Sequence, residues 1–134
     1  MKTVLFVCGH NAGRSQMAEA FTNAVADERA LAVRGVSGGT TPADSLNPAV
    51  VEAMAEIGVP LAGKKPKMLT AEMADEADRI ITMGCGVSVE SCPARVYVCE
   101  DWSLDDPAGQ PIERVRVIRD QIRAKVDELL SEWG

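Results

Sequence analysis

The residues best suited to do chemistry lie near the start of the chain, where a cysteine and an arginine stand six positions apart. They bound a short loop that follows an apolar run and opens an amphipathic one, and that reads Cys8-Gly9-His10-Asn11-Ala12-Gly13-Arg14-Ser15. The small residues between them let successive backbone N–H groups converge at a helix N-terminus, which carries partial positive charge. Arg14 adds a planar cation suited to two oxygens of a phosphate-like group. This loop, residues 9–15, predicts a site that binds a tetrahedral oxyanion and attacks it with the sulfur of Cys8.

Three features favour the thiolate form of Cys8: the converging N–H groups, the guanidinium of Arg14, and the hydroxyl of Ser15, which can donate a hydrogen bond to sulfur. Cysteines in such settings titrate at roughly 3.5 to 7.5 instead of about 8.5. We therefore expect Cys8 to be a nucleophile at neutral pH. The alternative is a small buried hydrophobe at a strand end, since a Cys-x5-Arg spacing arises easily by chance. The surrounding strand, glycines and helix favour the nucleophile, and the loop lacks the spacing of nucleotide-binding loops.

Length and composition exclude several classes of protein. At 134 residues the chain is the size of one domain, residues 1–134, and can bury a core without disulfides or a structural metal. A net charge of −6 and a pI of about 4.8 argue against nucleic acid or an anionic membrane as a partner. No export signal opens the chain and no apolar run is long enough to span a membrane, so we expect a cytoplasmic protein. A monomer is the expected state, although the sequence does not decide whether the chain dimerises. In the cytoplasm thiols stay reduced, so four cysteines are more naturally catalytic or redox-active than a structural framework of disulfides.

Apolar and helical patterns alternate along the chain, which is typical of βαβ units and an α/β fold with a parallel sheet. The expected strands are residues 3–7, 31–36, 79–83 and 95–99, and the expected helices are residues 14–29, 47–57 and 112–133. Loops are expected at residues 37–45, 62–69, 85–93 and 100–111, which are rich in Gly, Pro, Ser or Asp. The basic cluster Lys64, Lys65 and Lys67 could assist the approach of an anion, but a solvated run of charges is the preferred interpretation.

Two further cysteines, Cys85 and Cys92, follow the third expected strand. Cys85 should emerge at the same edge of the sheet as Cys8, because parallel strands present their ends at one edge. The residues between Cys85 and Cys92 are mostly small and polar, so this segment can change shape as a thiol passes from one sulfur partner to another. A zinc site is the alternative, but zinc needs about four ligands and the sole histidine, His10, lies in the oxyanion loop. We interpret Cys85 and Cys92 as a thiol relay and Cys99 as a buried structural thiol.

The segment after the fourth expected strand carries the candidate acid, Asp106. Pro107 fixes its own φ and restricts Asp106 to extended conformations, which helps to aim the carboxylate. A carboxylic acid beside a bound oxyanion can protonate the oxygen that departs when sulfur attacks. Asp-Pro is also an ordinary turn dipeptide, and only its place in a chain with Cys8 and Arg14 favours the catalytic role.

These residues resemble those of a known family, because the chain is similar to the arsenate reductases built on the low molecular weight tyrosine phosphatase fold. The resemblance covers almost the whole chain and rests on VCGHNAGRSQMAEAF near the start, on the pair Cys85 and Cys92, and on DDPAG around Asp106. Cys-x5-Arg-Ser with Asp-Pro fits phosphatases and reductases alike, and the two extra cysteines favour the reductase. The resemblance implies a four-stranded parallel sheet flanked by helices and an enzyme that reduces arsenate.

The resemblance also implies a series of thiol steps. Cys8 attacks arsenate in the loop closed by Arg14, with Asp106 assisting the departure of hydroxide. Cys85 then attacks Cys8, which releases arsenite and leaves a disulfide between Cys8 and Cys85. Cys92 next attacks Cys85, and thioredoxin or an equivalent small dithiol protein reduces the disulfide that joins Cys85 to Cys92. The resemblance implies no bound cofactor.

Some members of the family bind a potassium ion beside the loop, and Asn11, Glu19 and Ser37 match positions associated with it. The corresponding downstream segment here reads Lys65-Pro66-Lys67 and lacks the hydroxyl and carboxylate that help to complete such a site. This departure from the family's pattern argues against potassium in this chain, and a lysine ammonium is a candidate for the place of the cation.

Two other functions compete with arsenate reduction. A phosphatase would use Cys8, Arg14 and Asp106 and leave the relay cysteines idle. A cleft for tyrosine phosphate usually has aromatic walls, whereas the chain has few aromatic residues: one Tyr, two Phe and two Trp. A noncatalytic sensor of oxyanions or arsenite would use the same thiols to capture its ligand, but the chain has no DNA-reading element and Asp106 argues for turnover. The sequence leaves open the identity of the reductant and any residual phosphatase activity.

Overall fold

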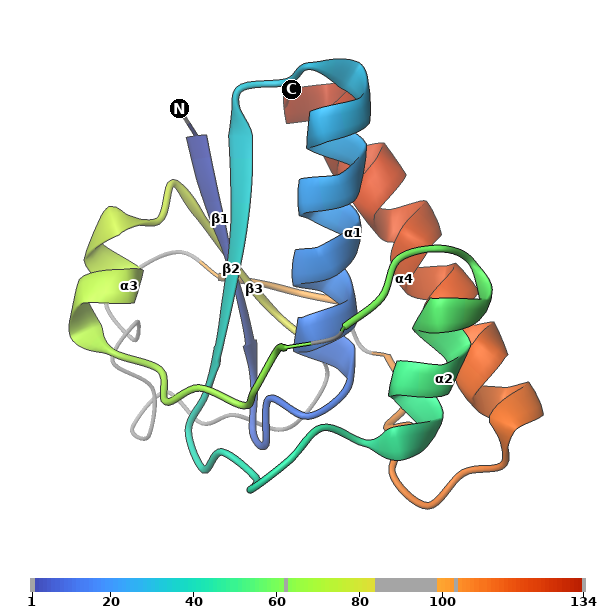
Figure 1. Cartoon of the computed structure of the whole chain (residues 1–134). Coiled ribbons are helices and arrows are strands. Elements are labelled where there is room, and N and C mark those ends of the chain that lie inside the picture. Colours follow the sequence, from blue (N-terminus) through green and yellow to red (C-terminus); the bar gives the residue numbers. More distant parts are fainter. Residues whose placement is uncertain (1, 62, 84–98, 103, 134) are drawn as a thin grey trace.

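The fold is seen in a computed structural model that describes residues 2–61, 63–83, 99–102 and 104–133 (Figure 1). Cys85, Cys92 and the expected loop around them lie outside the described residues. Side chains are described for the same ranges except residues 99–101 and 133.

A parallel sheet of four strands forms the centre of the molecule, with the strand order β2-β1-β3-β4. The strands are β1 (Lys2–Cys8), β2 (Val33–Gly39), β3 (Arg79–Thr82) and β4 (Cys99–Asp101). All three neighbouring pairs are parallel. The expected α/β class and four-stranded parallel sheet are therefore confirmed, and the carboxyl ends of the strands share one edge.

All four strands differ from expectation in at least one boundary: β1 gains one residue at each end, β3 ends one residue earlier, and β2 and β4 differ more. Strand β2 continues to Gly39 instead of ending at residue 36, because Gly39 pairs with Cys8 in the sheet and exchanges backbone hydrogen bonds with Lys67 and Leu69 on its other side. A Cβ atom at Gly39 would lie 2.7 Å from the carbonyl oxygen of Gly9, so only glycine permits this approach. Strand β4 begins at Cys99, as part of the expected strand, and continues to Asp101 over two residues expected to begin a loop, while residues 95–98 of the expected strand lie outside the described residues.

The helices are α1 (Arg14–Arg29), α2 (Pro48–Glu56), α3 (Ala71–Glu76) and α4 (Ile112–Trp133). The bounds of α1 and α4 agree with expectation, and α2 differs by one residue at each end because Asn47 is its N-cap. Helix α3 was not expected, since six residues are too few to show a helical period.

Residues of β1 alternate between two cores, as the period of a strand requires. Val4 and Phe6 pack with α1, α2 and α4, whereas Leu5 and Val7 pack against Leu69, Ala74 and Ile80. Figure 1 shows this division, with α1, α2 and α4 over one face of the sheet and α3 over the other. The two layers fix β1, which delivers Cys8 to the edge of the sheet.

Among the helices that the structure describes, none has the length and hydrophobicity of a membrane span.

Candidate oxyanion site

Cys8 and Arg14 face each other across the turn between β1 and α1. Cys8 is the last residue of β1 and Arg14 is the first of α1, and each is only 5% exposed. Gly13, the N-cap of α1, provides no side-chain hydrogen bond to the start of the helix. The backbone N–H groups at the start of α1 are therefore left for a ligand, as at other anion-binding helix N-termini.

A second segment holds the oxyanion loop from outside. Residues 40–47, between β2 and α2, donate backbone N–H groups to four carbonyl oxygens of the loop: Thr40 to Cys8 (3.3 Å), Thr41 to Gly9 (2.8 Å), Ala43 to His10 (2.9 Å) and Asn47 to Ala12 (2.9 Å). In a trans peptide the C=O and the following N–H point in opposite directions. Because the carbonyls face this bracing segment, the loop N–H groups that follow them face the other way.

Polar side chains fix the rear of the loop. Asn11 is fully buried with φ at 51°, and its Oδ1 accepts hydrogen bonds from the Lys67 backbone N–H and from Gln16 Nε2, both at 2.8 Å. Its Nδ2 donates to Ser15 Oγ at 2.7 Å. Since the Ser15 oxygen already accepts from Asn11, its hydroxyl hydrogen can be donated elsewhere, in keeping with the role expected for Ser15.

Arg14 uses one edge of its guanidinium for structure and leaves the other available. Nη1 donates to the carbonyl oxygens of Met83 (2.9 Å) and Leu104 (2.7 Å). Nη2 lies 3.8 Å from Cys8 Sγ, and Nε is buried with no hydrogen-bond partner. A buried N–H without a partner is costly unless a ligand satisfies it. The edge formed by Nε and Nη2 is therefore suited to two oxygens of a bound oxyanion.

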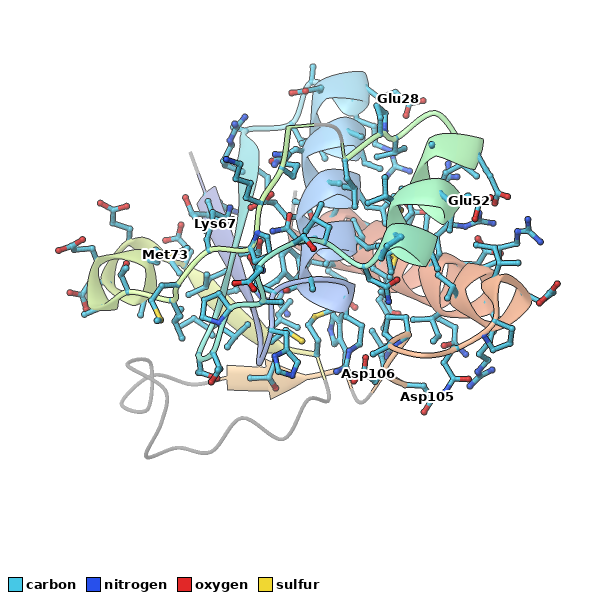
Figure 2. The ribbon with its side chains drawn as sticks, turned by 60° about the horizontal axis from the view of Figure 1, so that its bottom comes forward. Glu28, Glu52, Lys67, Met73, Asp105 and Asp106 are labelled. Atoms are coloured by element: carbon cyan, nitrogen blue, oxygen red, sulfur yellow. The ribbon has the colours of Figure 1, made fainter. Side chains whose placement is uncertain are left out.

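The candidate acid lies across from Arg14, on the segment that leads into α4. Asp106 Oδ2 is 3.8 Å from Arg14 Nη2, and Oδ1 accepts from the Ala108 N–H at 3.0 Å. Its side chain is 57% exposed. Its neighbour Asp105 pairs with Arg114 instead, so Asp106 is the carboxylate that faces the site (Figure 2).

These residues surround one cavity of about 430 Å³, lined by Cys8, Gly9, His10, Ala12, Gly13, Arg14, Ala43, Asn47, Asp106, Pro107 and Ala108. The cavity brings together most of the residues expected from the sequence, whereas Asn11 and Ser15 support it from behind. Sequence reasoning missed Ala43, Asn47 and Ala108, although Asn before Pro48 is a recognisable helix start. None of the described lining residues is Phe, Trp or Tyr.

A second charged cluster lies behind the loop, around Glu19. This carboxylate is 3% exposed, and it accepts a hydrogen bond from Ser37 Oγ at 3.1 Å. Lys67 Nζ lies 2.7 Å from Oε1, and Lys64 Nζ lies 3.4 Å from Oε2 (Lys67 is labelled in Figure 2). The interpretation of these two lysines as solvated charges only was therefore wrong, because each reaches a buried carboxylate 45 or more positions away.

The same cluster tests whether a potassium ion fits. Glu19 already receives two ammonium groups and a hydroxyl, and Asn11 Oδ1 already receives two N–H groups. Cations adjacent to the carboxylate oppose a further cation, so the residues do not fit a potassium ion. Among the described residues, no group of three or more His, Cys, Asp or Glu could hold a metal ion.

The remaining cysteines are placed only in part. Cys85 and Cys92 lie outside the described residues, so their proximity to Cys8 stays a prediction. Cys99 opens β4 and pairs with Ile80 in the sheet.

Comparisons with known proteins agree with this geometry. The chain is 42% identical over 131 residues to a Halobacterium salinarum protein named "Putative arsenate reductase", covering 96% of this chain and 91% of that protein. It is 33% identical to the glutaredoxin arsenate reductase of Synechocystis, covering 98% of each. A solved structure of an arsenate reductase in the phosphate binding state matches with a TM-score of 0.86 and 33% identity over 100% of both chains.

These similarities confirm the resemblance to arsenate reductases on this fold. The sequence pattern of one family matches residues 3–133, which is nearly the whole chain. The chain belongs to the low molecular weight phosphotyrosine protein phosphatase family.

Proposed function

We propose that the protein is an arsenate reductase that binds arsenate in the oxyanion loop and attacks it with Cys8. One observation carries the binding step: the buried Nε of Arg14 has no partner, and Nη2 beside it lies 3.8 Å from the Cys8 sulfur. A tetrahedral oxyanion would satisfy this edge and the N–H groups at the start of α1 together. The similarity to arsenate reductases over nearly the full chain supports arsenate as the substrate.

In the first step the Cys8 thiolate forms a sulfur–arsenic bond and one arsenic oxygen departs. Asp106 supplies a proton, so that the oxygen leaves as water instead of hydroxide. Ser15, whose oxygen accepts from Asn11, donates its hydroxyl hydrogen to the thiolate and favours that form of sulfur.

In the second step Cys85 attacks the sulfur of Cys8. A disulfide forms between the two, the pair of electrons of the sulfur–arsenic bond stays on arsenic, and arsenic leaves as arsenite. The Met83 carbonyl oxygen accepts a hydrogen bond from Arg14 Nη1, and two residues of chain span about 7 Å at most, which supports Cys85 as the attacking thiol.

In the third step Cys92 attacks Cys85, so Cys8 returns to the thiolate and the disulfide moves to the pair Cys85 and Cys92. Two electrons have then passed from two thiols to arsenic. We propose that thioredoxin, or another small dithiol protein such as glutaredoxin, reduces this last disulfide.

We also propose that Lys67 stands where some relatives hold potassium. Its ammonium lies 2.7 Å from Glu19 Oε1, and its backbone N–H holds Asn11, which in turn holds Ser15. The rear of the loop therefore contains its own cation, and the reaction should proceed without potassium.

The test is arsenate-dependent oxidation of NADPH in the presence of thioredoxin and thioredoxin reductase. The wild type should turn over repeatedly, whereas Cys92→Ser should stop after one reducing event. Cys99→Ser is the matched control and should turn over like the wild type. No arsenate-dependent oxidation by the wild type with either thioredoxin or glutaredoxin would overturn the proposal.

A phosphatase is the second candidate, because Cys8, Arg14 and Asp106 line one cavity and suffice for hydrolysis of a phosphate ester. The same assay separates the two functions if it is followed by an aryl phosphate. Hydrolysis that is rapid and survives in Cys92→Ser, without arsenate-dependent oxidation in the wild type, would favour the phosphatase.

A further inference from the structure

We propose that Asn47 is a positioning residue. It holds the segment around Asp106, the acid segment, at a fixed position relative to the oxyanion loop. This inference rests on the proposed function, because it concerns how the proton reaches the departing oxygen. Asn47 lies just before α2 and is among the residues that line the cavity. It touches three parts of the molecule at once.

Each polar group of Asn47 has its own partner. The backbone N–H donates to the carbonyl oxygen of Ala12 in the oxyanion loop at 2.9 Å. The side-chain Oδ1 accepts from the Ala49 N–H at 3.0 Å and so caps α2. The side-chain Nδ2 donates to the carbonyl oxygen of Pro107 at 3.4 Å. The first bond fixes Asn47 to the loop and the second fixes it to α2, so the third can hold the acid segment to the loop.

The acid segment has few other anchors, and they lie on either side of Asp106. On one side Leu104 accepts from Arg14 Nη1 at 2.7 Å. On the other side Pro107 accepts from Asn47 and from the Gln110 N–H at 3.1 Å, and its ring lies against Gly13, where a Cβ would be 3.0 Å from Pro107 Cγ. Asp106 itself is more than half exposed, and its own contacts are the Ala108 N–H at 3.0 Å and Arg14 Nη2 at 3.8 Å, while Asp105 pairs with Arg114. The anchors on either side therefore contribute to its place relative to the loop.

The position of the carboxyl group matters because proton transfer requires hydrogen-bond reach, roughly 2.6 to 3.2 Å between heavy atoms. Arg14 takes part in binding, so its anchor cannot be removed alone. Asn47 offers an anchor that can be removed without touching the reacting atoms. Its loss should lower the rate of the chemical step about five- to tenfold, the effect of one hydrogen bond on a barrier, and leave oxyanion affinity unchanged.

The test compares Asn47→Ser with the wild type. Serine keeps the cap of α2, because its hydroxyl can accept from Ala49, but it cannot reach Pro107. The rate is that of arsenate-dependent loss of two thiols in a single turnover, and the affinity is that for inorganic phosphate by calorimetry. Thr70→Ala, which removes the side-chain cap of α3, is the matched control and should not change the rate.

A double-variant cycle decides whether Asn47 acts through the acid. In an Asp106→Asn background, Asn47→Ser should cause no further loss, because there is no proton to position. An additive loss, a wild-type rate in Asn47→Ser, or an equal loss in phosphate affinity would each overturn the inference. These results are distinct from failure of the proposed function, in which the wild type would lose no thiols on addition of arsenate.

Discussion

Arg14 and Glu19 are two buried charges on the same helix, and the protein treats them in opposite ways. Arg14 is 5% exposed and Glu19 is 3% exposed. Arg14 has two carbonyl partners on one nitrogen, whereas its Nε has no partner. Glu19 receives hydrogen bonds on both of its oxygens, from Ser37, Lys64 and Lys67.

The difference distinguishes a site in which a buried donor needs a ligand as its partner from a cluster in which the buried carboxylate is already paired within the protein. A buried charge is costly unless it is paired or hydrogen-bonded. The protein itself compensates Glu19. The Nη2 of Arg14 lies 3.8 Å from the Asp106 carboxylate, whereas its Nε gains a partner only when an anion enters the cavity. Substitutions in front of the loop should therefore act on binding and catalysis, and substitutions behind it should act mainly on stability.

The largest expected effect is that of Arg14→Lys. Lysine keeps the positive charge but lacks the paired Nε and Nη2 donors, so it cannot bind two oxygens at once. We expect single-turnover arsenate reduction to fall about 10²- to 10³-fold, the range for loss of one oxyanion donor. Phosphate affinity, measured by calorimetry, should fall as well. A rate within a few-fold of the wild type in a folded variant would show that the available edge of Arg14 is not the binding group.

The second prediction concerns the ionisation of Cys8. Because Arg14 Nη2 lies 3.8 Å from the sulfur, the rate of alkylation of Cys8 should rise with pH to a midpoint below about 7.5, compared with about 8.5 for an ordinary thiol. Arg14→Gln, which removes the charge, should raise that midpoint. Mass spectrometry of the peptide containing Cys8 makes the measurement specific. A wild-type midpoint above 8 would contradict the thiolate assignment.

The third prediction concerns the charged cluster around Glu19 and is tested by Lys67→Met. This change leaves the Glu19 carboxylate with the more distant Lys64, so we expect the free energy of unfolding to fall by about 1 to 2 kcal/mol. Urea titration measures it. The wild-type rate of arsenate reduction should be the same in potassium and in choline salts, whereas the variant should gain activity from potassium.

Lys65→Met is the matched control for this prediction. The Lys65 side chain is exposed, and the Lys65 carbonyl oxygen, which the substitution keeps, accepts a hydrogen bond from Gln16. It should resemble the wild type in stability and in salt response. A wild type that requires potassium would show that Lys67 does not take the place of the cation.

The sequence alone predicted which residues line the front of the site, because Cys8 and Arg14 lie in one short stretch of chain. The spacing of Cys8 and Arg14 between a strand and a helix predicted the loop, and the bounds of α1 and α4 follow from long helical periods. The place of Asp106 after the last strand was enough to name it as a candidate, and it lines the same cavity.

The parts that the sequence did not predict depend on contacts between distant segments. The bracing segment 40–47 has no pattern of its own, and its role lies in four backbone hydrogen bonds to the loop. The pairs that Lys64 and Lys67 form with Glu19 join residues far apart in the chain, so local composition suggested only a solvated cluster. The approach of β2 to the loop at Gly39 is likewise a property of the packed sheet.

The smallest expected effect lies far from the loop, where Glu56 of α2 meets α4. The hydrogen bond from Arg116 lowers the pKa of Glu56 below 4.5, aided by Arg119. Because the folded protein lowers this pKa, the stabilisation is present above the ordinary value and is lost as pH falls through the lowered one. Glu56→Gln should therefore reduce Tm slightly at pH 7, and the difference from the wild type should vanish in more acidic solution.

Glu28→Gln, an exposed carboxylate on α1, is the matched control and should leave Tm unchanged (Figure 2). Activity should be unchanged in both variants, because neither residue lines the cavity. A loss of activity in Glu56→Gln would mean that the contact between α2 and α4 reaches the oxyanion loop through Asn47 at the start of α2. The part of the protein in which substitutions affect binding and catalysis would then include α2.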